Sequence, residues 1–136
     1  MPARSVHRLA AALLTFAAAV ALGGQAFAQE RWAAIAPNLE SSSTVVWATT
    51  KEQAQQLAIL ACKQVSQTCV ESAASTNGMD HVFAVMCCDE PSTGCAAAVG
   101  QNRSEALKEV KQVFADEGFS QCKLKSYFKA GTGEKG

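Results

Sequence analysis

The sequence predicts an α+β fold in which a strand–strand–helix–strand (ββαβ) unit occurs twice in tandem. Three features support this: short apolar segments typical of strands, two segments with apolar residues at helical spacing, and nearly constant offsets between the two halves. The offsets are 51 from Trp32 to Phe83, 52 from Ala54 to Ala106, and 53 from Cys69 to Cys122. We expect units at about 30–76 and 79–129 in one mostly antiparallel sheet, with both helices on one face.

The first 28 residues have the features of a secretory signal peptide. Arg4 and Arg8 make a basic start, an apolar run extends from Leu9 to Leu22, and cleavage is expected after Ala28. About 14 apolar residues cover roughly 21 Å, too little for a hydrocarbon core of about 30 Å, and no later stretch is long and apolar enough to span one. The sequence therefore predicts a periplasmic or secreted protein that does not span the membrane.

The remaining chain has the size and charge of one small folded domain. Removal of residues 1–28 from the 136 leaves 108 residues, with 10 basic and 12 acidic side chains. Without a basic excess there is no electrostatic case for nucleic-acid binding, and the apolar fraction of 49% is too high for a disordered chain. We expect one domain over 29–129 and a flexible tail over 130–136.

In the first unit, residues 32–36 and 44–48 have the apolar and β-branched composition of strands. Thr50 precedes a helix and has Gln53 as its capping-box partner. A third strand is expected over 69–74. The helix's apolar residues recur at helical spacing: Ala54, Leu57, Ala58, Ala61 and Val65.

In the second unit, Asn77-Gly78 predicts a type I′ turn before a strand over 82–87. A turn over 91–94 and a strand over 95–99 follow. Asn102 is expected to cap the second helix with Glu105, and Gly118 to end it. A half-buried strand is expected over 122–128. The second helix's apolar stripe consists of Ala106, Leu107, Val110, Val113 and Phe114.

All six cysteines lie after the signal peptide: Cys62, Cys69, Cys87, Cys88, Cys95 and Cys122. An even number in a small exported domain predicts three structural disulfides among 15 possible pairings. The local sequence favours Cys62–Cys69 and Cys88–Cys95, which leaves Cys87 for Cys122. Adjacent residues in a strand point to opposite faces, so Cys87 and Cys88 need different partners unless they form a strained vicinal bridge. The alternatives are free or reactive thiols and a soft-metal site around Met79, His81, Met86, Cys87 and Cys88.

The pattern resembles the bacterial domain-of-unknown-function family numbered 4189. The resemblance lies in the signal peptide, the Trp32–Ala36 strand, the alanine-rich Ala54–Cys62 segment followed by Cys69, and the small-residue segment Cys95–Gly100. It implies exported, disulfide-bonded repeats, and it brings no catalytic residues to carry over.

Residues capable of acid–base chemistry are few. His81 is the only histidine after residue 28, and it follows Asp80 in a turn, where a solvated side chain is favoured over a catalytic one. Asp89-Glu90 precedes Pro91 in a tight turn, which disfavours a paired-carboxylate site. We predict no catalytic, cofactor-binding or metal-ligating residues.

Two aromatic features suggest binding, each with a plainer structural interpretation. Lys123, Lys125 and Lys129 alternate with Tyr127 and Phe128 in a strip that could contact an anionic partner, although lysines on an edge strand also prevent aggregation. The tryptophans, Trp32 and Trp47, could stack on a ligand but are more typically buried in strands of a core.

These observations predict a non-catalytic binding or structural module, protein-binding or inhibitor-like, that needs no cofactor. Its partner would be another exported or cell-envelope protein, and the oligomeric state stays open. The alternative is a small periplasmic hydrolase or metal-handling protein that uses His81 with Asp80, Asp89 or the Cys87-Cys88 pair.

Overall fold

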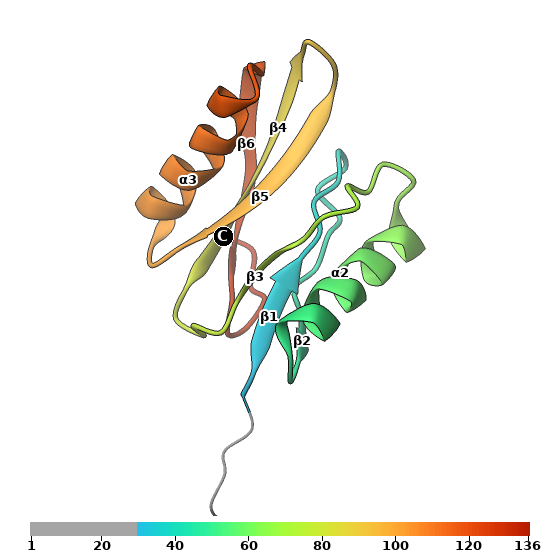
Figure 1. Ribbon diagram of the computed structural model, residues 1–136, viewed down its shortest axis with the longest axis vertical. Helices are drawn as coiled ribbons and strands as arrows, with labels where there is room; N and C mark the ends of the chain where they lie inside the picture. The colour runs from blue at the N-terminus through green and yellow to red at the C-terminus, as the bar shows by residue number, and fades with distance from the viewer. Residues whose placement is uncertain (1–29) are drawn as a thin grey trace, which may run out of the picture.

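The structure, a computed structural model, describes residues 30–136, so the predicted signal peptide lies outside the described residues. The described chain is α+β, as predicted (Figure 1). Within it, no helix has the length and apolar character needed to cross a membrane. The elements in order are β1 (Trp32–Ile35), β2 (Val46–Ala48), α2 (Lys51–Val65), β3 (Ala74–Thr76), β4 (Val82–Glu90), β5 (Gly94–Gly100), α3 (Arg103–Asp116) and β6 (Ser120–Lys129).

The strands form two antiparallel three-stranded sheets, ordered β2-β1-β3 and β5-β4-β6. In each sheet the first strand of that half of the chain is central. Helix α2 packs on the first sheet and α3 on the second, and Figure 1 shows the helices on opposite sides of the molecule. Antiparallel pairing is confirmed. The strands do not share one sheet, however, and the helices cover two separate outer faces.

Both central strands are apolar on both faces, which explains the two-sheet arrangement. On one face, Ala33 and Ile35 of β1 share a buried core with Phe83 and Val85 of β4. The alternate residues of β1 lie under α2 with Ala54, and those of β4 lie under α3 with Ala106 and Val110. A strand that is apolar on both faces needs cover on both, and here a helix covers one and the other sheet the second.

The predicted helix caps are confirmed. The Gln53 backbone N–H donates to Thr50 Oγ1 at 3.2 Å, and the Glu105 N–H donates to Asn102 Oδ1 at 2.9 Å. Gly118 has a φ of 77°, and its N–H donates to the Ala115 carbonyl at 3.2 Å. Each helix thus begins and ends at a residue suited to satisfying its free backbone groups.

The buried stripes differ in part from those predicted. In α2 the buried residues are Ala54, Ala58 and Cys62, and in α3 they are Ala106, Val110 and Phe114, 52 positions later in each case. Leu57 and Val65, predicted in the stripe of α2, are 45% and 61% exposed, and Val113 of α3 is 40% exposed. Each helix buries three residues spaced four apart against its sheet, and in α2 these three are small, so Leu57 and Val65 remain outside.

All six cysteines form disulfides, and the Cys62–Cys69 prediction is confirmed. The other predicted pairing was wrong, because the bonds are Cys87–Cys95 and Cys88–Cys122. Strand register explains the difference: Cys87 lies directly opposite Cys95 across β4 and β5, while Cys88 lies opposite Cys122 across β4 and β6. The adjacent cysteines therefore join the central strand to both of its neighbours.

Two connections also differ from expectation. Neither Asn77 nor Gly78 has a positive φ, so the predicted type I′ turn was wrong. A Cβ at position 78 would lie 2.3 Å from the His81 ring, so any other residue there would displace that ring. The third strand begins at Ala74 and not at 69, since Val70 instead bonds the Pro37 carbonyl through its N–H at 3.1 Å.

Residues 130–136, expected to be a flexible tail, turn back alongside β6. The Lys129 N–H donates to the Glu134 carbonyl at 2.9 Å, and the Gly136 N–H donates to the Tyr127 carbonyl at the same distance. This returning segment covers the outer edge of β6 from Tyr127 to Lys129.

Candidate functional site

The histidine singled out by the sequence holds a turn together. His81 Nδ1 lies 2.6 Å from Thr76 Oγ1, which also accepts the Gly78 N–H at 3.0 Å. Its Nε2 is 3.9 Å from Asp80 Oδ1. Thr76 is only 6% exposed, so its hydroxyl is closed to a substrate. These contacts fix the turn between β3 and β4.

Of the residues named for the alternative hydrolase or metal site, only Asp80 lies beside His81, at 3.9 Å. His81 precedes β4, whereas Asp89 lies near its far end. At about 3.3 Å per residue of strand, they are roughly 26 Å apart. Cys87 and Cys88 are in disulfides. Among residues 30–136, no three His, Cys, Asp or Glu side chains are placed to hold a metal ion.

The basic-aromatic residues of β6 do not form one surface. Phe128 is buried in the core between the sheets. Tyr127 packs toward α3, with the Arg103 guanidinium 5.3 Å from its ring centre. Lys129 pairs with Glu134 at 3.3 Å. Lys123 and Lys125 remain exposed but have no aromatic ring between them.

Both tryptophans are partly buried and pack against the core. Trp32 packs with the residues under α2, and Trp47 packs against the core between the sheets. The Trp47 Nε1–H donates to the Ala130 carbonyl at 2.8 Å, and the Arg31 guanidinium lies 4.9 Å from its ring centre. The Trp47 ring is thus held by contacts within the fold.

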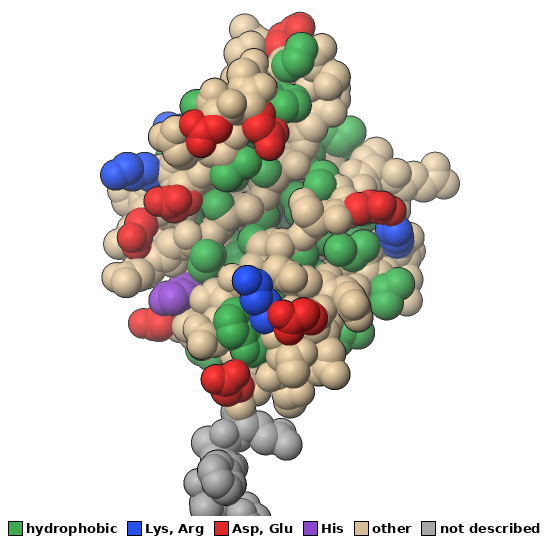
Figure 2. Space-filling view, in the orientation of Figure 1, with side chains coloured by type: hydrophobic (Ala, Val, Ile, Leu, Met, Phe, Trp, Pro, Cys, Tyr) green, Lys and Arg blue, Asp and Glu red, His purple; other side chains and the backbone are tan. Residues whose placement is uncertain are grey.

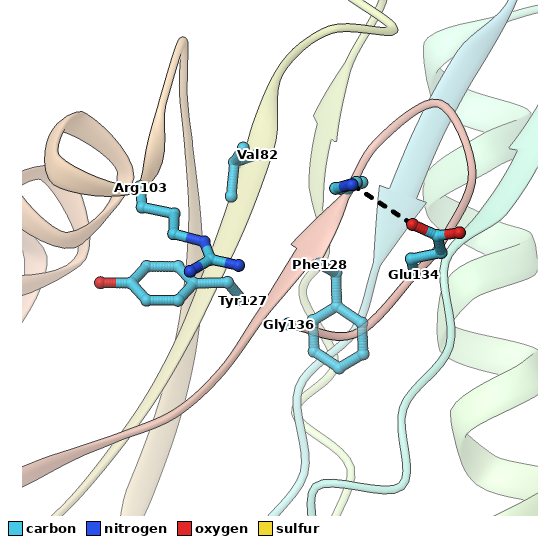
Figure 3. Close-up of a pocket in the computed structure, with 7 residues that line it drawn as sticks. Val82, Arg103, Tyr127, Phe128, Glu134 and Gly136 are labelled. Atoms are coloured by element: carbon cyan, nitrogen blue, oxygen red, sulfur yellow. Dashed lines mark hydrogen bonds and ion pairs between the residues drawn. The ribbon is translucent and has the colours of Figure 1, made fainter.

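A small pocket lies where β6, the start of α3 and the returning segment meet (Figure 3). It is lined by Val82, Arg103, Tyr127, Phe128, Lys129, Glu134 and Gly136. Its volume, about 40 Å³, is far below the roughly 300–1,000 Å³ typical of small-molecule sites. The cations on its wall already have partners, Tyr127 for Arg103 and Glu134 for Lys129.

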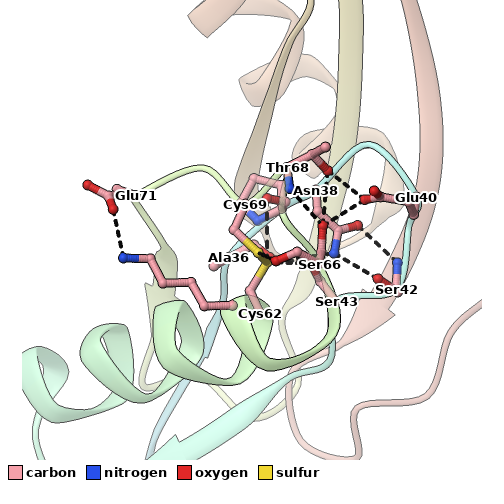
Figure 4. The surroundings of a disulfide bond; sticks show 12 residues. Ala36, Asn38, Glu40, Ser42, Ser43, Cys62, Ser66, Thr68, Cys69 and Glu71 are labelled. Carbon is pink, nitrogen blue, oxygen red and sulfur yellow. Dashed lines mark hydrogen bonds and ion pairs between the residues drawn. A yellow bond between two sulfur atoms is a disulfide. The ribbon is translucent and has the colours of Figure 1, made fainter.

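Buried polar groups surround the Cys62–Cys69 disulfide (Figure 4). Asn38 is fully buried, its Nδ2 donates to Ser42 Oγ at 2.8 Å, and its Oδ1 accepts the Ser42 N–H at 3.0 Å. The buried Ser43 hydroxyl donates to the Ala36 carbonyl. Because these groups satisfy one another, the loop after β1 is fixed beside the C-terminal end of α2.

The same loop is bonded to the segment that follows α2. Glu40 Oε2 accepts the Thr68 hydroxyl at 2.5 Å and the Ser66 hydroxyl at 2.8 Å. These hydrogen bonds hold the pKa of Glu40 below its ordinary value. Beyond them, Lys63 pairs with Glu71 at 2.7 Å, which lowers the pKa of Glu71. The end of α2 is thus held by a disulfide, a hydrogen-bond network and an ion pair.

Helix α2, held in this way, exposes large apolar side chains. Leu57 is 45% exposed and Leu60 is 58% exposed, and Val65 at the end of the helix is 61% exposed. Figure 2 shows hydrophobic side chains on the α2 side of the molecule, next to acidic and basic ones, and charged side chains of both signs along the α3 side. We call Gln53, Gln56, Leu57, Leu60, Ala61 and Gln64 the α2 face.

The α2 face carries no charge, although α3 carries several charges at the same positions. Counted from the N-caps Thr50 and Asn102, the α3 counterparts are Glu105, Lys108, Glu109, Gln112, Val113 and Asp116. The two helices bury equivalent positions against their sheets, so the fold does not require leucine on the outside of α2. The helical spacing of Leu57 predicted a core residue, so this surface was not predicted. Alignment of the two helices at their N-caps is the signal that could have revealed it, because α2 has leucine where α3 has polar residues.

Comparisons with protein-family models, with curated proteins and with solved structures find no match to this chain. A functional role for the chain therefore has to rest on its own residues.

Proposed function

We propose that this chain is an exported, non-catalytic module that binds another protein through the α2 face. The supporting observation is the exposure of Leu57 and Leu60 on a helix whose counterpart has Glu109 and Gln112 there. Exposed apolar groups that the fold does not need are typical of sites where proteins meet.

The rigidity of α2 supports the same role. Its C-terminal end is tied by the Cys62–Cys69 disulfide and by the bonds between Glu40, Ser66 and Thr68. A helix held in place before binding loses little conformational freedom when a partner docks, and this favours affinity.

We also propose that the domain is exported and consists of an internal repeat. Three disulfides are consistent with an oxidising compartment, as the predicted signal peptide requires. Each half has its elements in the order ββαβ, with its first strand central in its sheet. Membership of family 4189 stays a prediction from the resemblance. The partner would be a chain of the same compartment, either another exported protein or another copy of this one.

Size-exclusion chromatography of the native exported fraction, after brief chemical crosslinking that retains weak complexes, tests the binding role. We expect the protein to elute as a complex larger than a monomer, and Leu60→Glu to shift it to the monomer position. Gln112→Glu, at the matched position of α3, should leave elution unchanged. If both variants eluted like the wild type, the α2 face would not be a binding site.

A further inference from the structure

We propose that the partner of the α2 face is a second copy of this chain, joined by antiparallel pairing of two α2 helices. This inference rests on the binding role proposed above and names its partner.

The absence of charge on the α2 face restricts the partner. Its six residues are glutamine, leucine and alanine, and the charged residues of α2 are Lys51, Glu52 and Lys63, all outside it. A charged partner surface would bury its charges against Leu57 and Leu60 without compensation, which is unfavourable. A neutral surface of mixed amide and apolar groups fits, and a second α2 face is such a surface.

The residues along the face are arranged to pair with themselves. Gln53, Leu57, Leu60 and Gln64 are spaced by four, three and four residues, the spacing of a helix–helix seam. The order Gln-Leu-Leu-Gln is the same in both directions. An antiparallel copy therefore places Leu57 against Leu60 of the second copy, and Gln53 against its Gln64. A twofold interface requires this kind of self-complementary surface.

The flanking charges favour the antiparallel orientation. Glu52 lies in the first turn of α2 and Lys63 in the last, on the same side of the seam. An antiparallel pair brings Glu52 to the end of the helix that carries Lys63 of the second copy, where Lys63 also keeps its pair with Glu71 of its own chain at 2.7 Å. A parallel pair would leave Glu52 of one copy and Lys63 of the other at opposite ends of the seam, so this attraction would be absent.

The dimer should be weak and reversible. The seam has only two leucine layers. We therefore expect it to bury less surface area than the roughly 1,200 Å² that stable complexes bury. We expect a dissociation constant on the order of 10 µM or weaker.

Sedimentation equilibrium of the full exported protein, with its disulfides formed, tests the proposal over a range of concentrations. The wild type should show a monomer–dimer equilibrium, and Leu60→Glu should remove it. Gln53→Glu combined with Gln64→Lys sets opposite charges face to face in the antiparallel pair, so the dimer should tighten by about threefold to tenfold. Gln53→Glu combined with Gln64→Glu sets like charges face to face and should weaken it by a similar factor. Gln112→Glu should change nothing.

Three results would overturn the proposal. A wild type that stays monomeric up to about 1 mM excludes the second copy as the partner. In that case, if Leu60→Glu still disrupts a complex in the exported fraction, the α2 face binds another protein. A dimer unaffected by Leu60→Glu uses a different surface. Weakening by the Gln53→Glu and Gln64→Lys pair, at unchanged thermal stability, indicates a parallel arrangement.

Discussion

Leu60 of α2 and Gln112 of α3 occupy the same place in their helices, ten residues after the N-caps Thr50 and Asn102. Leu60 is 58% exposed although the neighbouring position toward the sheet, Ala58, is buried. Both helices use the same three positions to contact their sheets, so their outer faces are free to differ. The fold therefore does not require a leucine at position 60.

Changes on the outside of α2 should leave folding intact, whereas changes on its inside should not. We expect Leu60→Gln to alter the free energy of unfolding by less than about 0.5 kcal/mol, since the side chain packs little within the domain. Ala58→Leu should lower it by about 1–3 kcal/mol, because the added atoms have no space between α2 and β1. Urea unfolding measures both, and a larger loss for Leu60→Gln would mean that Leu60 serves the core.

The three disulfides should contribute unequally to stability. Cys88–Cys122 closes a segment with a sequence separation of 34, and Cys62–Cys69 one of 7. In the chain-entropy account, replacing both cysteines by alanine should lower the free energy of unfolding by about 4 kcal/mol for the first pair and about 2 kcal/mol for the second. Denaturant unfolding of the two double variants compares them, and the reverse order would contradict this account.

The pairing itself is open to thiol counting. Cys87→Ala with Cys95→Ala removes one complete bond and should leave no free thiol. Cys88→Ala with Cys95→Ala leaves Cys87 and Cys122, which point to opposite faces of the sheet, and should give two free thiols. Two free thiols in the first variant and none in the second would instead support the bonds Cys88–Cys95 and Cys87–Cys122, which the sequence favoured.

Gly100 should tolerate no side chain. A Cβ there would lie 2.3 Å from the Ala106 backbone nitrogen, so the first turn of α3 would have to move. We expect Gly100→Ala to lower the free energy of unfolding by about 3 kcal/mol. Gly118→Ala is the control. A Cβ there would meet open space, and only the φ of 77° disfavours alanine, so we expect the free energy of unfolding to fall by about 1 kcal/mol. Equal losses in thermal unfolding would show that α3 does not approach β5 this closely.

Glu40 should make stability depend on pH in acid. Its pKa is lowered in the folded state by the hydroxyls of Thr68 and Ser66, so its carboxylate stabilises the fold above the unfolded-state pKa. That contribution is lost as the pH falls through the lower, folded-state pKa. Glu40→Gln should therefore be less stable than the wild type at neutral pH, and the difference should vanish in strong acid. Urea unfolding at several pH values tests this against Glu109→Gln, an exposed carboxylate on α3.

Much of the fold could be predicted from the sequence because it depends on local rules. The caps at Thr50 and Asn102 and the helix end at Gly118 follow from the side chains that satisfy free backbone groups. The division into two sheets could not be predicted in this way. It depends on β1 and β4 being covered on both faces, which is a property of packing between distant segments.

The candidate site was harder to predict, for a similar reason. Leu57 has the spacing of a core residue, and only the narrow contact of α2 with its sheet leaves it outside. Register likewise decides that Cys87 faces Cys95, one residue away from the pairing that the loop length favoured. The spacing of apolar residues predicts whether a segment is a helix or a strand. It does not show which face of that element packs against the rest of the fold.

The binding role of α2 is tested most directly by site-specific photo-crosslinking in the native exported fraction. A photoreactive amino acid replaces Leu60 in one variant and Gln112 in another, so that the two probes differ only in the helix that carries them. We predict a discrete protein adduct from position 60 and none from position 112, with a mass of two chains if the partner is a second copy. Equal labelling from both positions, or no adduct from position 60, would contradict the account.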